Sequence, residues 1–252
     1  MTGPVLAEWE QVASRFGVGM EQVRRDHLIS HVLAAVSSDV PSDDLVFFGG
    51  TALSRTHLAD ARLSEDIDLI AQIARNDVAE QIERAVRRGI ARSHGRPTWE
   101  PALTATVGSQ PSVLSVADGT SVQVQLLSGD GYSWPTEVME MEQRYSDAPP
   151  ARLRVLTPDA FAAAKLGAWI DRGTPRDLYD LWAMSERGLI GPSALRLFIA
   201  HGPFGTPPAA WVFDRVLDEG AWTRALGHQT QLRVSALEAM TVVREAWLGT
   251  AT

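Results

Sequence analysis

Two aspartates separated by a single residue offer the clearest chemistry in this chain. Asp66 and Asp68 flank Ile67 and lead into Leu69-Ile70, a pattern typical of a β-strand. Alternate residues of a strand point to the same side, so the two carboxylates would face one place. Like charges held this close repel each other unless a cation lies between them. Because oxygen-only ligands favour magnesium over zinc, the pair predicts a Mg²⁺ site.

A glycine-rich turn precedes the two aspartates. The apolar run from Leu45 to Phe48 ends in Gly49-Gly50, and Thr51 then opens a short helical pattern. Glycine lets the backbone approach a ligand closely, and a helix N-terminus offers N–H groups to a phosphate. A phosphate cradle beside a magnesium-binding Asp-x-Asp would serve phosphoryl or nucleotidyl transfer. In the plainer interpretation, the glycines only make a tight turn and Thr51 only caps the helix.

A second candidate motif surrounds the one lysine of the chain. The sequence has 22 arginines but a single lysine, Lys165, in the segment AAAKLGAWIDRGTPRDLYDL. A position kept as lysine can need a compact ammonium, which the planar fork of arginine cannot replace. The plainer interpretation is codon bias that left one surface lysine. Asp177 follows Thr174 by three residues and could simply complete a helix cap. Capping cannot explain Asp180, which lies one turn further on.

The two motifs together resemble those of the AbiEii-type nucleotidyltransferase toxins. This family belongs to the DNA polymerase β-like superfamily and includes the MenT toxins of mycobacteria. The similarity spans about residues 45 to 185. It rests on FGGTAL at 48–53, RLSEDIDL at 62–69, and then Lys165, Ala168, Arg172, Arg176, Asp177 and Asp180.

The resemblance also implies roles for individual residues. We expect catalytic roles for Asp66, Asp68, Lys165 and Asp180, with Asp66 and Asp68 as the metal ligands. We expect nucleotide binding by Gly49, Gly50, Thr51, Ser64, Arg172 and Asp177. Plainer interpretations remain open for two of these, because Ser64 could bond Asp66 locally and Arg172 could be a structural ion-pair partner.

The activity implied by the resemblance is nucleotide transfer to RNA. A toxin of a toxin–antitoxin system would move NMP from an NTP to the 3′ end of tRNA, release pyrophosphate and block translation. Mg²⁺ would be its cofactor and a cognate antitoxin its protein partner. Two alternatives stay open: an enzyme of the same fold that modifies a protein or a small molecule, and a catalytically silent module that binds antitoxin or RNA.

One feature departs from the wider superfamily, in which many enzymes carry a third carboxylate on a later strand. The candidate strand here, residues 121–126, reads SVQVQL and has glutamine where an acid is expected. The third metal ligand is therefore missing or comes from elsewhere, which puts a full two-metal arrangement in doubt.

The bulk composition limits the class of protein. The 252 residues suit one large domain or two small ones, and the formal net charge of −8 argues against a dedicated duplex-DNA binder. The absence of cysteine excludes disulfides and fits a reducing cytoplasm. We find no secretory signal pattern and no apolar run of membrane-spanning length, so we expect a cytoplasmic protein.

Hydrophobic periodicity predicts an α+β fold in two parts. The resemblance implies that residues 1–150 form a nucleotidyltransferase-type mixed sheet with helices. It also implies that residues 151–252 form a helical lobe that contributes Lys165 and Asp180 to the cleft. We expect N-terminal helices at 6–16, 20–37, 76–93 (capped by Asn76) and 136–145. Strands are expected at 45–48, 66–71, 103–107, 113–116, 122–127 and 153–156. Residues 128–135 are expected to form a loop. Thr157-Pro158 and Thr174-Pro175 predict helix starts, and C-terminal helices are expected at 158–171, 175–187, 192–200, 208–217, 220–227 and 233–248.

Two further patterns lie outside these motifs. Arg84, Arg88 and Arg92 recur every four residues and would share a helix face, either solvated or used to follow RNA phosphates. His27 and His31 are also spaced for one helix face. No third ligand is evident near them, so the sequence does not predict a zinc site there.

Overall fold

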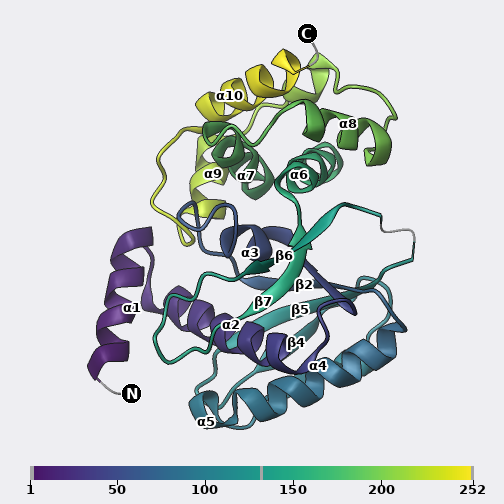
Figure 1. Cartoon of the computed structure of the whole chain (residues 1–252). Coiled ribbons are helices and arrows are strands. Elements are labelled where there is room, and N and C mark those ends of the chain that lie inside the picture. Colours follow the sequence, from purple (N-terminus) through teal and green to yellow (C-terminus); the bar gives the residue numbers. More distant parts are fainter. Residues whose placement is uncertain (1–2, 131–132, 251–252) are drawn as a thin grey trace. The chain divides into compact units, whose positions relative to one another are not determined.

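A mixed β-sheet and a set of helices belong to two separate units of the chain (Figure 1). The computed structural model describes residues 3–130 and 133–250. Unit 1 comprises Met1–Val155 and unit 2 comprises Leu156–Thr252. The predicted α+β class is confirmed. The division falls after Val155, so most of the last strand stays with the sheet, whereas the predicted boundary at residue 150 assigned it to the helical half.

Among the described residues of unit 1, the sheet has seven strands in the order β3-β4-β5-β2-β1-β7-β6. Strand β1 pairs antiparallel with β2 and parallel with β7, and β2 pairs parallel with β5. The apolar runs of β1 and β2 fit their central, buried positions. The strands are β1 (Leu45–Phe48), β2 (Asp66–Ala71), β3 (Thr98–Glu100), β4 (Ser112–Ser115), β5 (Ser121–Ser128), β6 (Thr136–Glu140) and β7 (Arg152–Leu156).

Helices α2 and α4 pack against each other, and both contact β5, so they cover one face of the sheet (Figure 1). Gly89 permits the close approach, because a Cβ there would lie 2.4 Å from the Cβ of Ala35 on α2. Helix α1 adds Trp9 and Phe16 to an apolar cluster beside α2. The helical elements of unit 1 are α1 (Gly3–Phe16), α2 (Met20–Asp39), α3 (Gly49–Ser54), α4 (Arg75–Gly89), α5 (Ala91–His94) and the 3₁₀ turn η1 (Leu103–Ala105).

Unit 2 is helical, as the sequence predicts. Helix α7 contacts α6, α9 and α10, and α6 also contacts α8. The predicted caps are confirmed, since Thr157 and Thr174 accept hydrogen bonds from backbone N–H groups of α6 and α7. Its elements are α6 (Pro158–Arg172), α7 (Pro175–Glu186), α8 (Pro192–His201), the 3₁₀ turn η2 (Ala210–Phe213), α9 (Glu219–Leu226) and α10 (Ala236–Gly249). Within the described ranges, no helix is long and apolar enough to cross a membrane.

Three predicted elements are wrong. The expected helix at 136–145 is strand β6, because its place in the sheet next to β7 overrides the helix propensity of its Glu and Met residues. The expected strand at 103–107 is only the turn η1, and the helix expected at 208–217 is only η2, which follows Pro207-Pro208. Strand β3 was not predicted. Residues 131 and 132 of the expected loop at 128–135 lie outside the described residues.

The predicted helix at 76–93 also needs correction. Its N-cap is Ala74 rather than Asn76, and it ends at Gly89. Helix α5 follows as a separate element and carries Arg92. Arg84, Arg88 and Arg92 therefore do not lie on one continuous helix. Arg88 forms an exposed ion pair with Asp39, at 2.8 Å.

A buried ion cluster connects three segments of unit 1. Oδ1 of Asp26 on α2 accepts hydrogen bonds from Arg55 Nη2 at 2.7 Å and from Arg144 Nη1 at 2.9 Å. Tyr145 donates its hydroxyl to Asp26 Oδ2 at 3.0 Å. Burial lowers the pKa of Arg55 to about 10, still well above neutrality. Arg55 therefore remains charged, and Asp26 is the fully buried carboxylate between the two guanidinium groups.

We predict that Asp26→Asn lowers the free energy of unfolding by about 3–5 kcal/mol, because it leaves two buried cations without their shared anion. Urea denaturation measures the change. The matched control is Asp39→Asn, which removes one partner of the exposed pair with Arg88. Its effect should stay within about 1 kcal/mol. Equal losses in the two variants would contradict a special role for the buried cluster.

Candidate active site

The predicted metal ligands Asp66 and Asp68 occupy one face of β2. Both are half-buried, whereas Ile67 between them is buried on the opposite face. The parallel register pairs Asp66 with Gln123 and Asp68 with Gln125 of β5. Each aspartate thus has an amide, not a carboxylate, at the paired position of the neighbouring strand. The carboxylates lie at the start of a central strand, whose neighbours on both sides restrict their position.

The glycine turn lies directly against these side chains. Gly49 has a φ of +77°, and a Cβ there would lie 2.0 Å from Asp68 Oδ2. A Cβ on Gly50 would lie 2.8 Å from Arg62 Nη2 and 3.0 Å from Ser64 Oγ. Gly49 therefore has two reasons to be glycine, its backbone conformation and the carboxylate packed over it. The turn brings Ser64 and the buried Arg62 close to the first N–H groups of α3.

The side chain of Thr51 does not cap helix α3. Helix α3 already begins at Gly49, and no side chain caps it. The hydroxyl of Thr51 donates to the backbone carbonyl of Asp66 instead. The interpretation of Thr51 as an N-cap is therefore wrong. Its side chain joins α3 to β2 and thus fixes the glycine turn relative to the aspartate pair.

Lys165 lies in a buried ion cluster of unit 2. Its Nζ is 2.6 Å from Asp180 Oδ2 and 3.4 Å from Asp177 Oδ1. Its exposed fraction is only 7%, so the interpretation as a leftover surface lysine is wrong. An ammonium has three donors, and these two carboxylates can take two of them. The Lys165–Asp180 contact is a short, charge-assisted bond that fixes the ammonium in place.

Asp177 takes part in the helix cap, as the sequence suggested, and it also forms ion pairs with Lys165 and Arg172. Thr174 accepts from its backbone N–H and donates its hydroxyl to Oδ2 at 2.6 Å. Arg172 donates to the same carboxylate from Nε at 2.7 Å and from Nη2 at 2.8 Å. Burial raises the pKa of Asp177, but the bonds from Arg172 and Thr174 and the charge of Lys165 outweigh it. The pKa lies well below its usual range, so the group is a carboxylate at neutral pH.

The local sequence explains how the side chains of Lys165, Asp177 and Asp180 come together. Helix α6 ends in Gly173, which has a φ of 59° and forms a left-handed C-cap. Thr174 and Pro175 start α7 at once. This short connection turns the chain, and residues 177 and 180 are three apart and share a helix face. Lys165, two turns before the end of α6, can then reach both carboxylates.

Sequence reasoning missed the groups that support the first motif. Arg62 was part of the motif but was given no role, and Asp26, Arg55 and Arg144 were not singled out. Arg55 is the C-cap residue of α3, and its guanidinium reaches Asp26. The position of Arg55 directly after the short helix α3 was the only signal for its role, and its partners are far away in the sequence.

With this geometry established, the family can be identified. The profile described as the nucleotidyl transferase AbiEii toxin of type IV toxin–antitoxin systems matches residues 31–240. The match covers most of the chain and both motifs. The chain belongs to this family of nucleotidyltransferase toxins, which confirms the resemblance drawn from the motifs. Membership implies an antitoxin partner and an NTP substrate.

The solved structure of MenT4 supports the fold, and two other structures match with lower TM-scores. MenT4, a nucleotidyltransferase toxin from Mycobacterium tuberculosis H37Rv, is 20% identical with a TM-score of 0.71, and the match covers 92% of this chain and 84% of MenT4. A protein from H. pylori described as a candidate nucleotidyltransferase is 14% identical, with a TM-score of 0.47 and coverages of 93% and 95%. A nucleotidyltransferase-like protein from Paracoccidioides brasiliensis is 13% identical, with a TM-score of 0.40 and coverages of 64% and 77%. No curated protein sequence matches significantly.

We predict that Gly49→Ala lowers the free energy of unfolding by about 1–3 kcal/mol, since alanine is strained at positive φ and its methyl would overlap Asp68. Gly167→Ala on α6 is the control, because a Cβ there meets nothing within 4 Å. That change should stabilise the protein by about 0.5–1 kcal/mol. Chemical denaturation compares the two. An unchanged free energy of unfolding in Gly49→Ala would mean that the turn and Asp68 separate easily.

Proposed function

We propose that this toxin transfers NMP from an NTP to the 3′ end of tRNA in the cytoplasm, releases pyrophosphate and so blocks translation. The observation that carries the proposal is the packing of Asp68 against the Gly49-Gly50 turn, with Asp66 on the same strand face. This arrangement holds two carboxylates beside backbone N–H groups that helix α3 leaves unpaired at its start. An NTP needs both, because its triphosphate is anionic and is usually bound with a divalent cation.

The donor set of the aspartate pair fits magnesium. Asp66 and Asp68 offer only oxygen, and they lie on one face of β2 beside the space that a Cβ on Gly49 would fill. These two residues would hold Mg²⁺, which when bound neutralises charge on the triphosphate. Because β5 has Gln123 and Gln125 opposite them, we propose that water and phosphate oxygens complete the coordination, as is usual for Mg²⁺.

The chain's own groups would bind and orient the reactants. The backbone N–H groups of Gly50 and Thr51 would bind the triphosphate, with Ser64 and Arg62 beside them. The 3′-hydroxyl of the RNA would attack the α-phosphorus. A P–O bond forms, the bond to pyrophosphate breaks, and the hydroxyl proton passes to solvent.

Lys165 would neutralise the negative charge that develops on the leaving pyrophosphate. Its ammonium keeps one donor beyond those directed to Asp180 and Asp177. The 2.6 Å contact between Lys165 and Asp180 supports Asp180 as a positioning residue rather than a base. Arg172 and Asp177 would keep this part of the nucleotide site ordered, since the bidentate contact between them is rigid.

The proposal is tested by incubating the protein with total RNA and each labelled NTP in turn. We expect one NTP to label RNA of tRNA size, and Asp68→Asn to reduce labelling by about a hundredfold or more. The control is Asp77→Asn, an exposed carboxylate on α4 outside both motifs, which should label normally. Label on protein would favour the same-fold enzyme with another acceptor. No transfer at all would favour the catalytically silent module.

We predict that Lys165→Arg folds normally but transfers nucleotide about a hundredfold more slowly. The planar guanidinium keeps the charge but cannot occupy the position of the ammonium between Asp177 and Asp180, and misplacement by roughly an ångström has a cost of this order. Growth inhibition on expression should be lost in parallel. Circular dichroism checks the fold, and Arg224→Lys, at an exposed site on α9, is the control swap. Full activity and toxicity in Lys165→Arg would leave the lysine with a structural role only.

A further inference from the structure

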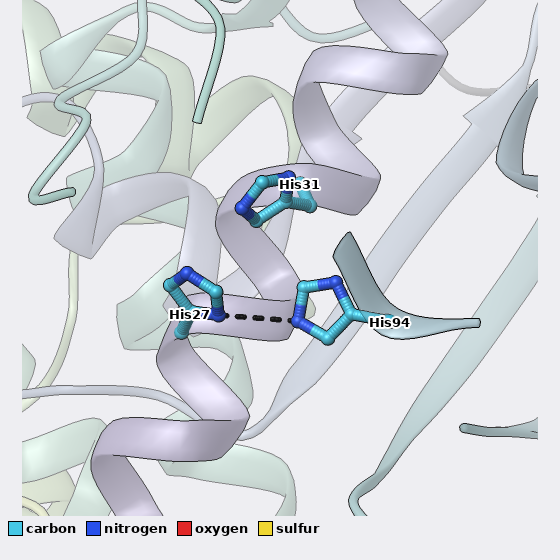
Figure 2. A group of neighbouring side chains, drawn as sticks. All are labelled: His27, His31 and His94. Carbon is cyan, nitrogen blue, oxygen red and sulfur yellow. Dashed lines mark hydrogen bonds between the residues drawn. The ribbon is translucent and has the colours of Figure 1, made fainter. Parts of the chain in front are cut away.

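Three histidines from two helices converge in unit 1, away from both motifs. His27 and His31 lie one turn apart on α2, and His94 is the last residue of α5. Figure 2 shows the three rings turned toward one another, with a hydrogen bond between His27 and His94. One nitrogen of each ring lies within 4.8 Å of a nitrogen of both others. The sequence showed the pair on α2, and the fold adds the third member.

We propose that His27, His31 and His94 form a binding site for Zn²⁺ or a similar divalent transition-metal ion. Imidazole nitrogen is a ligand that such ions prefer, and three histidines with one open position make a common zinc set. Zn–N bonds of about 2.0–2.1 Å at tetrahedral angles place ligand nitrogens about 3.3 Å apart. Nδ1 of His27 and Nε2 of His94 are already 3.1 Å apart. His31 would complete the set by a side-chain rotation, since one of its nitrogens already lies within 4.8 Å of the other two ligand atoms.

A carboxylate lies behind the histidines, as is usual at metal sites. Asp147 accepts from His27 Nε2, with oxygens at 3.1 and 3.2 Å. This contact favours the proton on Nε2 of His27, so that its Nδ1 accepts the hydrogen bond from His94 Nε2. An ion would replace the proton shared between these two nitrogens. On the other side, His94 Nδ1 is 2.9 Å from Ser93 Oγ, which leaves Nε2 for the ion. The outer nitrogens of two rings thus have partners, and their inner nitrogens face each other.

His31 gives a second, independent indication. It is buried, and its Nε2 has no hydrogen-bond partner in the structure. Asp147 Oδ2 lies 3.6 Å from this nitrogen, too far for a hydrogen bond. Buried polar atoms are rarely left unsatisfied without a reason. An ion bound between the rings would draw His31 into the set and satisfy its nitrogen.

The site has an entry path for an ion. A pocket of about 540 Å³ is lined by His27, His94 and Asp147, together with Trp9, Arg24 and Arg92. Its open side gives the ion access and leaves the fourth position for water.

A bound ion would cross-link α2 to α5, between residues 67 positions apart in the sequence. Helix α5 is only four residues long, too short to be stable by itself. We infer that the ion would hold α5 against α2. The site shares no residue with the Asp66–Asp68 pair, so its test does not depend on nucleotide transfer.

The experiment uses full-length, untagged protein stripped with a chelator and titrated with Zn²⁺ by calorimetry. We expect one ion per chain, and Co²⁺ in its place should give the visible absorption of a tetrahedral site. His94→Gln should weaken Zn²⁺ binding by about a hundredfold, because it removes one of three ligands. Asp147→Asn should weaken it by about 10–100-fold through loss of the orienting carboxylate. His201→Gln, at an exposed histidine of α8, is the matched control and should bind as the wild type does.

The outcomes separate the proposal from a metal-free histidine cluster. The absence of binding to the wild type, or wild-type affinity in both His94→Gln and Asp147→Asn, would overturn it. Asp68→Asn should retain full zinc affinity, and loss of binding in that variant would assign the ion to the carboxylate pair instead. Asp147 is partly exposed, so its variant keeps the test valid if His94→Gln fails to fold. Circular dichroism identifies a folding failure.

Discussion

The position of the glycine turn in unit 1 depends on one buried carboxylate, Asp26. It holds Arg55 and Arg144, two cations that have almost no exposed surface of their own. Such a cluster is a poor source of stability, because desolvation cancels much of the attraction. Its value is geometric. Arg55 ends helix α3, and Thr51 ties the same helix to the backbone of Asp66. The short helix is thus fixed at two points, and the glycine turn at its start has one position relative to the aspartates.

The sequence predicts what local spacing determines and fails where distant segments meet. Alternation along a strand was enough to pair Asp66 with Asp68, and the Thr-Pro pairs marked the starts of α6 and α7. The partner of Asp26 could not be found this way, because Arg144 lies 118 residues away. The prediction of a helix at 136–145 failed for the same reason. This Glu- and Met-rich segment forms strand β6 only because it pairs within the sheet. The histidine pair on α2 was visible, but its third member comes from a different helix.

The two motifs use charge in opposite ways. In unit 1, two half-buried carboxylates share one face of β2, with amides opposite them on β5. In unit 2, Lys165 and Arg172 face Asp177 and Asp180, and the four charges balance. The first arrangement is suited to attracting a cation. The second is suited to holding an ammonium still, with Asp177 serving the helix cap and the ion pairs at once.

The burial of the one lysine has a practical consequence. The chain has a single ε-amino group, and its contact with Asp180 shields it from solvent. An acylating reagent can reach this amine only when the ion pair opens. The rate at which mass spectrometry detects acylated Lys165 is therefore a direct reading of how often α6 and α7 part at this point. The wild-type protein thus carries its own reporter of local opening, with no label to introduce.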